Sequence, residues 1–213
     1  APGMPVLRVP LEAGGPGLRV QVWDDVVDAL DMGPEAGQWL QTFLGAPAQR
    51  LVRFAPAAQR ACSTKWTDGV AASTQFADGY PVLVTTNSAM DELNTRLVAQ
   101  GHAAVDMRRF RPNLVLSGLP PHDEDHLGPL DVLVDDAVVA ALQLVKPCAR
   151  CPIPNIDPQT ALSHPGVSDA LQAYRQDARL DGAITFGMNA IVTRGAGAVL
   201  RVGQAVRGDY VFG

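Results

Sequence analysis

Two cysteines three positions apart are the residues of this chain best suited to chemistry. A cation precedes each of them, because Lys146 lies two residues before Cys148 and Arg150 lies directly before Cys151. Thiolates rather than thiols bind metals and attack electrophiles, and nearby positive charge favours the thiolate. Three prolines follow the second cysteine closely, and proline restricts both its own backbone and that of the residue before it. We therefore predict that residues 144–158 form a stiff loop rather than a helix or a central strand.

The Cys148–Cys151 pair has four interpretations. A structural zinc site normally needs four ligands, but the only other cysteine is Cys62 and no histidine pair has zinc-finger spacing. A thioredoxin-like redox pair opens a helix, which Pro152 and Pro154 disfavour. The other two interpretations are a pair of inert, partly buried thiols and a thiolate that acts as ligand or nucleophile. A soft thiolate suits a thiophilic transition metal, and we favour this last interpretation.

A cluster of arginines is the second candidate site. Arg108, Arg109 and Arg111 fall within four positions of an otherwise acidic protein. We predict a strand over residues 110–116 with a basic entry, and alternation along it would put Arg109 and Arg111 on the same side. Arginine forks match phosphate or carboxylate oxygens. The alternative is a solvated strand edge.

Two polar segments are weaker candidates. Residues 85–88 (Thr-Thr-Asn-Ser) lie at a predicted strand-to-helix turn, where free N–H groups and hydroxyls can bind an anion. Plain helix capping is the alternative interpretation. Residues 122–126 contain two histidines around three acids. They could hold a metal, but we predict an exposed acidic loop.

The composition limits the class of protein. The 213 residues carry a net charge of −5, which argues against nucleic-acid binding because that usually needs a basic face. Three cysteines are too few for a secreted disulfide framework, so we expect a reducing compartment, the cytoplasm. No apolar run has the length of a membrane span. The chain begins at Ala1 rather than Met, and we expect that it is a piece of a longer protein.

Many short strands separated by turns, with few helices, predict a mixed α/β, β-rich fold in which peripheral helices surround a β-barrel. A possible domain boundary lies in the punctuated stretch 55–80. The predicted strands cover residues 6–9, 18–23, 26–32, 51–54, 81–86, 110–116, 131–134, 138–145 and 186–192, with a final hairpin at 198–202 and 204–207. The predicted helices cover residues 35–44, 87–100 and 167–175.

Several motifs, taken in order, resemble the MOSC domain family. They are residues 88–94, 109–113, 146–151 with 157–158, 174–175, 186–187 and 202–204. The family includes the C-terminal domain of molybdenum cofactor sulfurase, the mitochondrial amidoxime-reducing component and, as the best match here, bacterial enzymes that reduce N-hydroxylated bases. The resemblance implies a MOSC β-barrel with peripheral helices at residues 59–213. Residues 1–58 resemble the C-terminal part of the β-rich domain that precedes it.

The resemblance also implies a cofactor and a site. The cofactor would be molybdenum–molybdopterin, with Cys151 as the catalytic thiolate ligand of the metal; pyridoxal phosphate is not expected in this domain. The residues that would hold or approach the pterin, its phosphate or the metal site are Arg111, Asn113, Thr86, Asn87, Ser88, Arg109, Ala149, Arg150 and Cys148. Cys148 is the alternative ligand.

The implied reaction is the reduction of N-hydroxylated compounds such as amidoximes and hydroxylated purines. Electrons would come from a separate ferredoxin-like or flavin reductase, because the chain lacks an iron–sulfur set of cysteines. The alternative function is a carrier of the cofactor, or a sulfur-transfer module, without reductase turnover. The chain departs from the family in two ways. A cofactor-contacting N-terminal segment is missing before Ala1, and Pro152 and Pro154 replace the residues that usually follow the cysteine.

Overall fold

The computed structural model describes residues 1–12 and 14–211, and the chain divides into two compact units. The first unit contains Ala1–Cys62 and Ser73–Gly79, and the second contains Ser63–Ala72 and the chain from Tyr80 onward. The assignment of residues 1–58 to a MOSC N-terminal domain, and of 59–213 to the MOSC domain, stays a prediction.

The first unit is built on a small antiparallel sheet and one helix. Strand β1 (Gly17–Val22) pairs with β2 (Asp25–Asp31), which pairs with β3 (Val52–Phe54). Helix α1 (Pro34–Leu44) has proline in its first turn and ends at a left-handed Gly45, as predicted from these two residues. A second pair joins β4 (Arg60–Ala61) to β5 (Ser73–Thr74). The predicted strand at residues 6–9 is wrong, because a tight turn pairs β1 with β2 instead.

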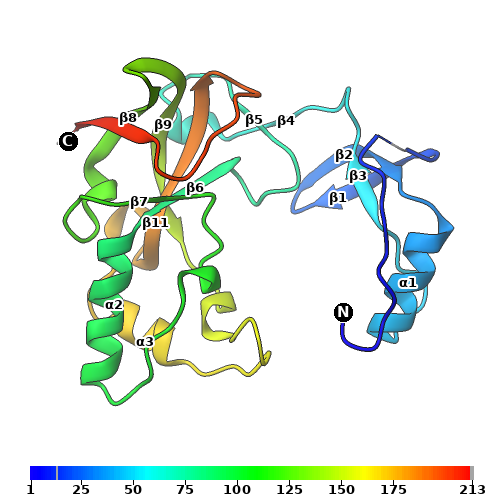
Figure 1. The fold of residues 1–213 in the computed structure, drawn as a ribbon, viewed down its shortest axis with the longest axis horizontal. Helices are drawn as coiled ribbons and strands as arrows, with labels where there is room; N and C mark the ends of the chain where they lie inside the picture. The colour runs from blue at the N-terminus through cyan, green and yellow to red at the C-terminus, as the bar shows by residue number, and fades with distance from the viewer. Residues whose placement is uncertain (13, 212–213) are drawn as a thin grey trace. The chain divides into compact units, whose positions relative to one another are not determined.

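The second unit is organised around a curled sheet with strand order β12-β8-β9-β11-β6-β7 (Figure 1). Short β10 (Gln176–Asp177) pairs with β11 outside this path. All neighbours along the path are antiparallel except β6 and β7. The strands are β6 (Val82–Thr86), β7 (Leu114–Leu116), β8 (Leu127–Val134), β9 (Ala137–Ala149), β11 (Ala183–Arg194) and β12 (Ala205–Tyr210).

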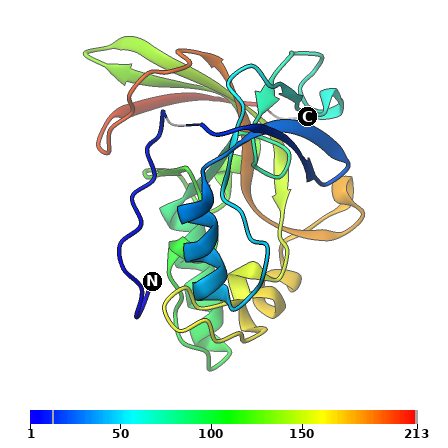
Figure 2. The same cartoon turned by 90° about the vertical axis from the view of Figure 1, so that its right-hand side faces the viewer.

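Two helices lie side by side against the end of this sheet, as the two perpendicular views show (Figures 1 and 2). Helix α2 spans Asn87–Ala99 and α3 spans Gly166–Gln172. Their apolar faces form one core with Phe110 and Phe186, whose rings stack at 4.0 Å between centroids. A second core fills the concave side of the sheet with leucines, valines and alanines from β6, β8, β9 and β11. The mixed α/β, β-rich fold with peripheral helices is confirmed.

Two of the predicted strands near the ends of the sheet are wrong in extent. Of the strand predicted at residues 110–116, only β7 (Leu114–Leu116) is present. Residues 107–109 form the 3₁₀ turn η2, and the φ of 56° at Arg111 interrupts the extended backbone. The predicted final hairpin around Gly203 is also absent. Residues 198–202 form no strand, and β12 pairs with β8 instead.

The prediction of a loop at residues 144–158 is wrong for its first part, because β9 continues through Pro147 to Ala149. The pairing of β8 with β9 reaches only as far as Gln143. Beyond that residue β9 has β11 as its one strand neighbour, so it is locally an edge strand, and edge strands tolerate proline. The loop begins only after β9 and contains the 3₁₀ turn η4 (Ile153–Asn155).

No helix among residues 1–12 and 14–211 combines the length and the apolar composition that crossing a membrane requires.

Candidate functional site

A β-bulge in β9 decides which way the side chains before the cysteines point. Ala190 of β11 pairs with Leu144, whereas the preceding Asn189 pairs with Lys146. Val145 is therefore an extra residue on β9, and such a residue reverses the alternation of side chains that follows it. Leu144 faces the sheet core, but beyond the bulge Pro147 is the buried residue and Lys146 and its alternate neighbours lie on the opposite face.

Lys146, Cys148 and Arg150 follow one another at alternate positions on this face, which we call the thiol face. The Arg150 Nη1 donates a hydrogen bond to Cys148 Sγ at 3.0 Å, and its Nη2 donates to the carbonyl oxygen of Phe110 at 3.1 Å. The Arg150 Nε is buried and has no protein partner among the described residues. The guanidinium also lies 5.4 Å from the centroid of the Phe110 ring. Arg150 is therefore held in place with donor capacity remaining.

All three cysteines are free, but their surroundings differ. Cys151 is exposed, Cys148 is half-buried, and Cys62 is buried in the first unit. Burial raises the pKa of the Cys62 thiol, which makes it a poor nucleophile or ligand. Accessible thiols thus occur only where β9 ends, and Ala149 between them is exposed as well.

The loop after Cys151 is fastened by Arg109. Its guanidinium donates to the carbonyl oxygens of Pro154 and Asn155 at 3.2 and 3.1 Å and to Asp157 Oδ2 at 2.9 Å. Backbone hydrogen bonds from Thr160 and Gln159 lower the pKa of Asp157, and Arg109 adds to this effect. The Arg109 side chain is only 13% exposed. The predicted cofactor ligand Arg109 therefore has its donors occupied by the cysteine loop.

Arg111 and Asn113 lie elsewhere than the predicted strand would put them. Arg109 belongs to η2 and Arg111 to a left-handed turn, so the prediction that they share one strand face is wrong. Arg111 is exposed, and its guanidinium has no ion pair or hydrogen bond within the described part of the chain. The Asn113 Oδ1 accepts a hydrogen bond from the Leu83 N–H at 2.8 Å, which leaves its amide NH₂ available.

One row of the sheet links Asn113 to the thiol face. Leu83 pairs with Asn189, and Asn189 pairs with Lys146. Because Asn113 and Leu83 hydrogen-bond to one another, the row runs from Asn113 across β6 and β11 to β9. Three strand spacings separate its ends, roughly 14 Å. Asn113 therefore lies level with the start of the thiol face.

The predicted anion site at residues 85–88 is a capped helix start in which the Thr86 hydroxyl is occupied. Thr86 Oγ1 accepts a hydrogen bond from the Ala89 N–H at 3.2 Å and donates to Glu124 Oε2 at 2.9 Å. Plain N-capping is thus confirmed for Thr86, which is fully buried. Asn87 is exposed, and the buried Ser88 Oγ has no protein partner among the described residues.

The predicted exposed acidic loop at 122–126 is wrong. These residues lead into the 3₁₀ turn η3 (Asp123–His126), in which Glu124 is fully buried. Burial raises the pKa of Glu124 to about 7, against the lowering effect of the Thr86 hydrogen bond. Its neighbour Asp125 forms an ion pair of 2.6 Å with Arg175. Burial raises the pKa of Asp125, and the charge of Arg175 opposes this.

Aromatic rings pack around Glu124 and its polar neighbours. We call this set the buried polar cluster (Thr86, Glu124, Asp125, His122, Tyr174 and Arg175). His122 packs edge-on against Tyr174 and Phe186. Burial lowers the pKa of His122 to about 4, with a smaller contribution from Arg175, so it is neutral at pH 7. Burial likewise raises the pKa of Tyr174 to about 12. No group of three or more His, Cys, Asp or Glu side chains in the described ranges is arranged to hold a metal ion.

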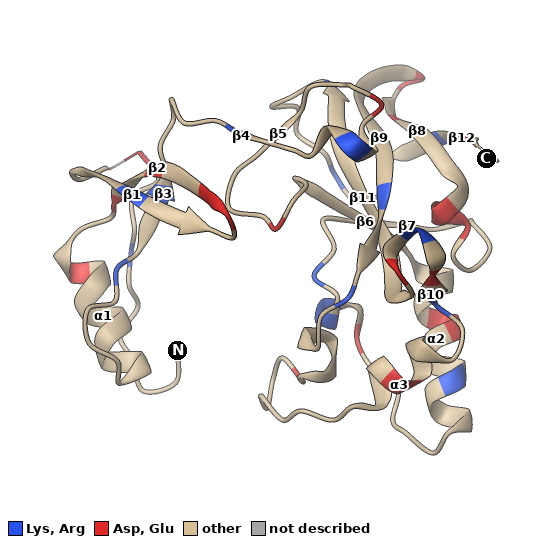
Figure 3. Cartoon of the chain, turned by 180° about the vertical axis from the view of Figure 1, so that it is seen from behind, with Lys and Arg blue, Asp and Glu red and all other residues tan. Residues whose placement is uncertain are grey.

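Sequence reasoning missed the environment of Trp66. This residue ends the 3₁₀ turn η1 (Thr64–Trp66) of the second unit. Lys146 Nζ lies 5.7 Å and Lys65 Nζ 5.6 Å from the centroid of its ring. The available signal was that these are the only two lysines in the sequence. Figure 3 shows that residues of both signs of charge are spread over the second unit.

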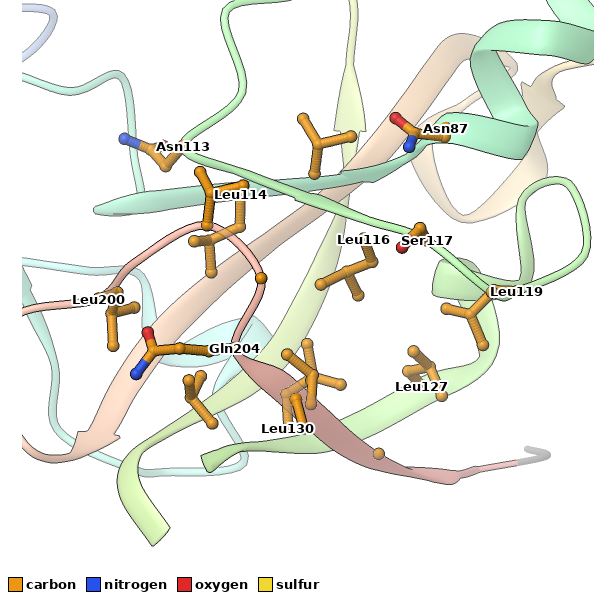
Figure 4. A pocket seen from close by; sticks show the side chains of 18 of the residues that line it. Asn87, Asn113, Leu114, Leu116, Ser117, Leu119, Leu127, Leu130, Leu200 and Gln204 are labelled. Carbon is orange, nitrogen blue, oxygen red and sulfur yellow. The ribbon is translucent and has the colours of Figure 1, made fainter. Parts of the chain in front are cut away.

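A cavity of about 970 Å³ lies between β7, β8 and β12. Leu114 and Leu116 of β7 face Leu127 and Leu130 of β8 across it (Figure 4). Two predicted site residues, Asn87 and Asn113, contribute to its lining, but neither cysteine does. Figure 4 shows that the Asn113 amide points away from this space. The cavity is therefore an opening of the sheet with a mixed polar and apolar lining, separate from the thiol face.

Comparison with known proteins gives a consistent set of relatives. Residues 71–207 match the sequence model of the MOSC domain. The chain is 30% identical over 177 residues to mitochondrial amidoxime-reducing component 1 of Mus musculus, covering 80% of this chain and 48% of that protein. The human protein of the same name is 31% identical over 153 residues, which is 70% of this chain and 43% of the relative.

A second kind of relative is also present. Molybdenum cofactor sulfurase of Caenorhabditis briggsae is 27% identical over 166 residues, covering 76% of this chain and 19% of that protein. The chain thus spans about half the length, or less, of the curated relatives that it matches.

Proposed function

This chain belongs to the MOSC family, and from that premise we propose that it is part of a molybdenum-cofactor-dependent reductase of N-hydroxylated compounds. Cys151 supplies the protein thiolate to the metal in this proposal. The observation that carries it is the exposed Cys151, two residues beyond the end of β9 and next to the face formed by Lys146, Cys148 and Arg150. The names of the amidoxime-reducing relatives support the substrate class.

The residues of the thiol face fit a molybdenum–pterin cofactor. Molybdenum in such a group is thiophilic, and an accessible thiolate suits it. The group is anionic, and the Arg150 guanidinium, which makes no ion pair within the described residues, supplies a positive charge for it. Arg111 has an exposed guanidinium, and Asn113 has a free amide NH₂. We propose that Arg111 and Asn113 hold the pterin or its phosphate, while Ala149 and Arg150 border the metal.

Arg109, Thr86 and Ser88 take supporting roles in this proposal. Arg109 fixes the loop after Cys151 through its three hydrogen bonds, so it positions the thiol without touching the cofactor. Thr86 fixes the start of α2. Asn87 and Ser88 remain candidate contacts of the cofactor at that turn.

When bound, the cofactor supplies the two-electron chemistry at the metal. Reduction of an amidoxime consumes two electrons and two protons, breaks the N–O bond, and releases an amidine and water. The electrons come from a separate ferredoxin-like or flavin reductase in this proposal. We place the protein in the cytoplasm, because its three thiols are all free.

Metal analysis of cysteine variants tests the proposal. The chain would be purified, within its full-length protein, from a host that makes the molybdenum cofactor, beside Cys151→Ser, Cys148→Ser and Cys62→Ser. We expect near-stoichiometric molybdenum in the wild type, its loss in Cys151→Ser and its retention in Cys62→Ser, which controls for thiol loss at a buried site. Amidoxime reduction with an artificial reductant should follow the metal content. Molybdenum that disappears only in Cys148→Ser would reassign the ligand, and its absence from the wild type would refute the cofactor.

A second function shares the same site. Because Cys151 is exposed and free, it could carry sulfane sulfur or present the cofactor to another enzyme, and one relative is named a molybdenum cofactor sulfurase. A loaded protein that reduces neither amidoximes nor hydroxylated purines with artificial reductant, yet releases its cofactor to an acceptor enzyme, would favour this carrier function.

A further inference from the structure

The two lysines of this protein converge on one tryptophan. The chain uses arginine for fifteen of its seventeen cations, and its lysines are eighty-one positions apart. Nevertheless both ammonium groups lie within 5.7 Å of the centroid of the Trp66 ring. Neither has an ion-pair partner among the described residues, although most arginines with side-chain contacts pair with Asp or Glu. Two unneutralised cations on one aromatic ring form a distinct electrostatic feature.

The ring and the lysines are held in place rather than scattered on the surface. Thr67, directly after Trp66, is buried, and its hydroxyl donates to the Val70 carbonyl oxygen at 2.8 Å. The Tyr80 hydroxyl donates to the Ser63 carbonyl oxygen at 3.3 Å just before η1. Lys146 comes from β9, where the bulge at Val145 fixes its direction. The turn and the strand therefore bring Lys65 and Lys146 together from two sides.

This feature adjoins the thiol face. Lys146 and Cys148 are alternate residues on the same side of β9, about 7 Å apart along an extended strand. Arg150, the next residue on that side, contacts Cys148 Sγ. A ligand that reaches the thiols can therefore extend along β9 to Lys146 and Trp66.

We propose that Lys65, Trp66 and Lys146 form an anion subsite for a phosphate-bearing, planar heteroaromatic ligand that occupies the thiol face. This inference rests on the proposed function, which puts such a ligand there. The ammonium groups supply point charges for phosphate, and the nearby indole supplies a flat apolar surface. The phosphate could belong to the cofactor or to a phosphorylated substrate, so the test separates these two sources.

The scarcity of lysine makes the subsite directly observable. Within this chain, reductive methylation with ¹³C-formaldehyde labels no side chains other than those of Lys65 and Lys146, and it keeps their charge. Cofactor-free protein from a host that lacks the cofactor pathway would be labelled and titrated with inorganic pyrophosphate. We expect the two lysine methyl signals to move together and to saturate. The variants Lys65→Gln and Lys146→Gln assign the signals, and each should weaken pyrophosphate binding about tenfold, the loss of one charge-assisted contact.

Arg194→Gln is the matched control, because it removes one exposed positive charge from the far end of β11. It should leave pyrophosphate binding within about twofold of the wild type. Trp66→Leu keeps both charges and removes the aromatic ring, so it should weaken binding of a phosphorylated heteroaromatic compound more than binding of pyrophosphate. Circular dichroism of each variant checks that the fold is retained.

The loaded protein then identifies the source of the phosphate. If Lys146→Gln lowers the molybdenum content, the subsite holds the cofactor. If the content is retained but KM rises for a phosphorylated and not for an unphosphorylated N-hydroxylated purine, it holds the substrate. Lysine signals that do not respond to pyrophosphate or to cofactor loading, with binding equal in Lys146→Gln and Arg194→Gln, would overturn the proposal. A wild type without molybdenum whose lysines still bind pyrophosphate would refute the proposed function and leave the subsite intact.

Discussion

The thiol face and the buried polar cluster differ in their exposure and in the partners of their arginines. In the buried polar cluster, Arg175 contacts Asp125 and Thr185, and the Thr86 hydroxyl makes two hydrogen bonds. On the thiol face, Cys148 is half-buried and Arg150 makes no ion pair within the described residues, and the exposed Cys151 follows them. The first arrangement uses polar groups to hold helices and sheet together. The second leaves them available, at the cost of interactions that would otherwise stabilise the fold.

This contrast separates residues that bind from residues that support. Arg109 and Arg111 are two positions apart, yet one is enclosed by the cysteine loop and the other projects without a protein partner in the described ranges. Removing a supporting residue should therefore reduce stability, and removing a binding residue should reduce ligand retention with little change in stability. The predictions below follow this division from the largest expected change in stability to the smallest.

Breaking the ion pair of the buried polar cluster should have the largest effect. Arg175→Met leaves the Asp125 carboxylate, which is 13% exposed, without its cation, and such a loss costs on the order of 3–5 kcal/mol. The exposed pair Arg207–Asp131 is the control, and Arg207→Met should cost far less because solvent screens this pair. Urea unfolding of both variants measures the difference. Equal effects would show that burial does not distinguish the two pairs.

Glu124 should give the buried polar cluster a pH-dependent stability. Its pKa is about 7 in the folded protein against 4.5 for the ordinary group, so between these values the unfolded chain loses a proton that the folded protein keeps. Stability therefore falls as pH rises through this window, by on the order of 3 kcal/mol in total. Below pH 4.5 both states are protonated, and the penalty disappears.

The variant Glu124→Gln tests this sign, because glutamine is neutral at every pH and keeps an oxygen to accept from the Thr86 hydroxyl. The variant should gain stability relative to the wild type between pH 4.5 and 7, when unfolding is followed across pH 4 to 8. A constant difference between the two proteins over that range would mean that folding does not raise the pKa of Glu124.

Local signals in the sequence predict part of this architecture correctly. Pro34 and Gly45 mark the ends of α1, and the apolar run before residue 87 marks β6. The errors occur where long-range packing outweighs local composition. Residues 122–126 have the composition of a solvated loop, but Glu124 is buried because η3 packs against β6 and β11. No local pattern contains that information.

The sequence predicted which residues form the candidate site better than it predicted how they are arranged. The spacing of Cys148 and Cys151 indicates a reactive site in a loop and in a strand alike. The wrong prediction of a loop therefore did not change the choice of these two cysteines as candidates. The role of Lys146 depended on the extra residue Val145 and on the end of β8 pairing at Gln143, which are properties of the sheet register. Trp66 joins the site only through folding, since it lies eighty positions before Lys146.

Arg109 should give an intermediate effect and test whether it is a supporting residue. Arg109→Met removes hydrogen bonds to two carbonyl oxygens and to Asp157, which costs on the order of 2 kcal/mol. Hydrogen exchange should increase selectively at residues 152–162. Arg108→Met is the matched control, because the Arg108 side chain is 62% exposed and its loss should leave the loop protected. Unchanged exchange in Arg109→Met would assign the arginine to ligand binding instead.

Arg111 should give the smallest change in stability and the clearest loss of binding. Its side chain is exposed and unpaired in the described structure, so Arg111→Gln should shift unfolding by no more than about 0.5 kcal/mol. Molybdenum content should nevertheless fall, because the proposal gives this guanidinium to the pterin or its phosphate. Arg111→Gly sharpens the test, because the φ of 56° at Arg111 favours glycine. The stability of this variant should equal or exceed that of the wild type, while its molybdenum is still lost. A stable, fully loaded Arg111→Gly protein would remove Arg111 from the site and leave Arg150 and the lysines to carry the charge of the thiol face.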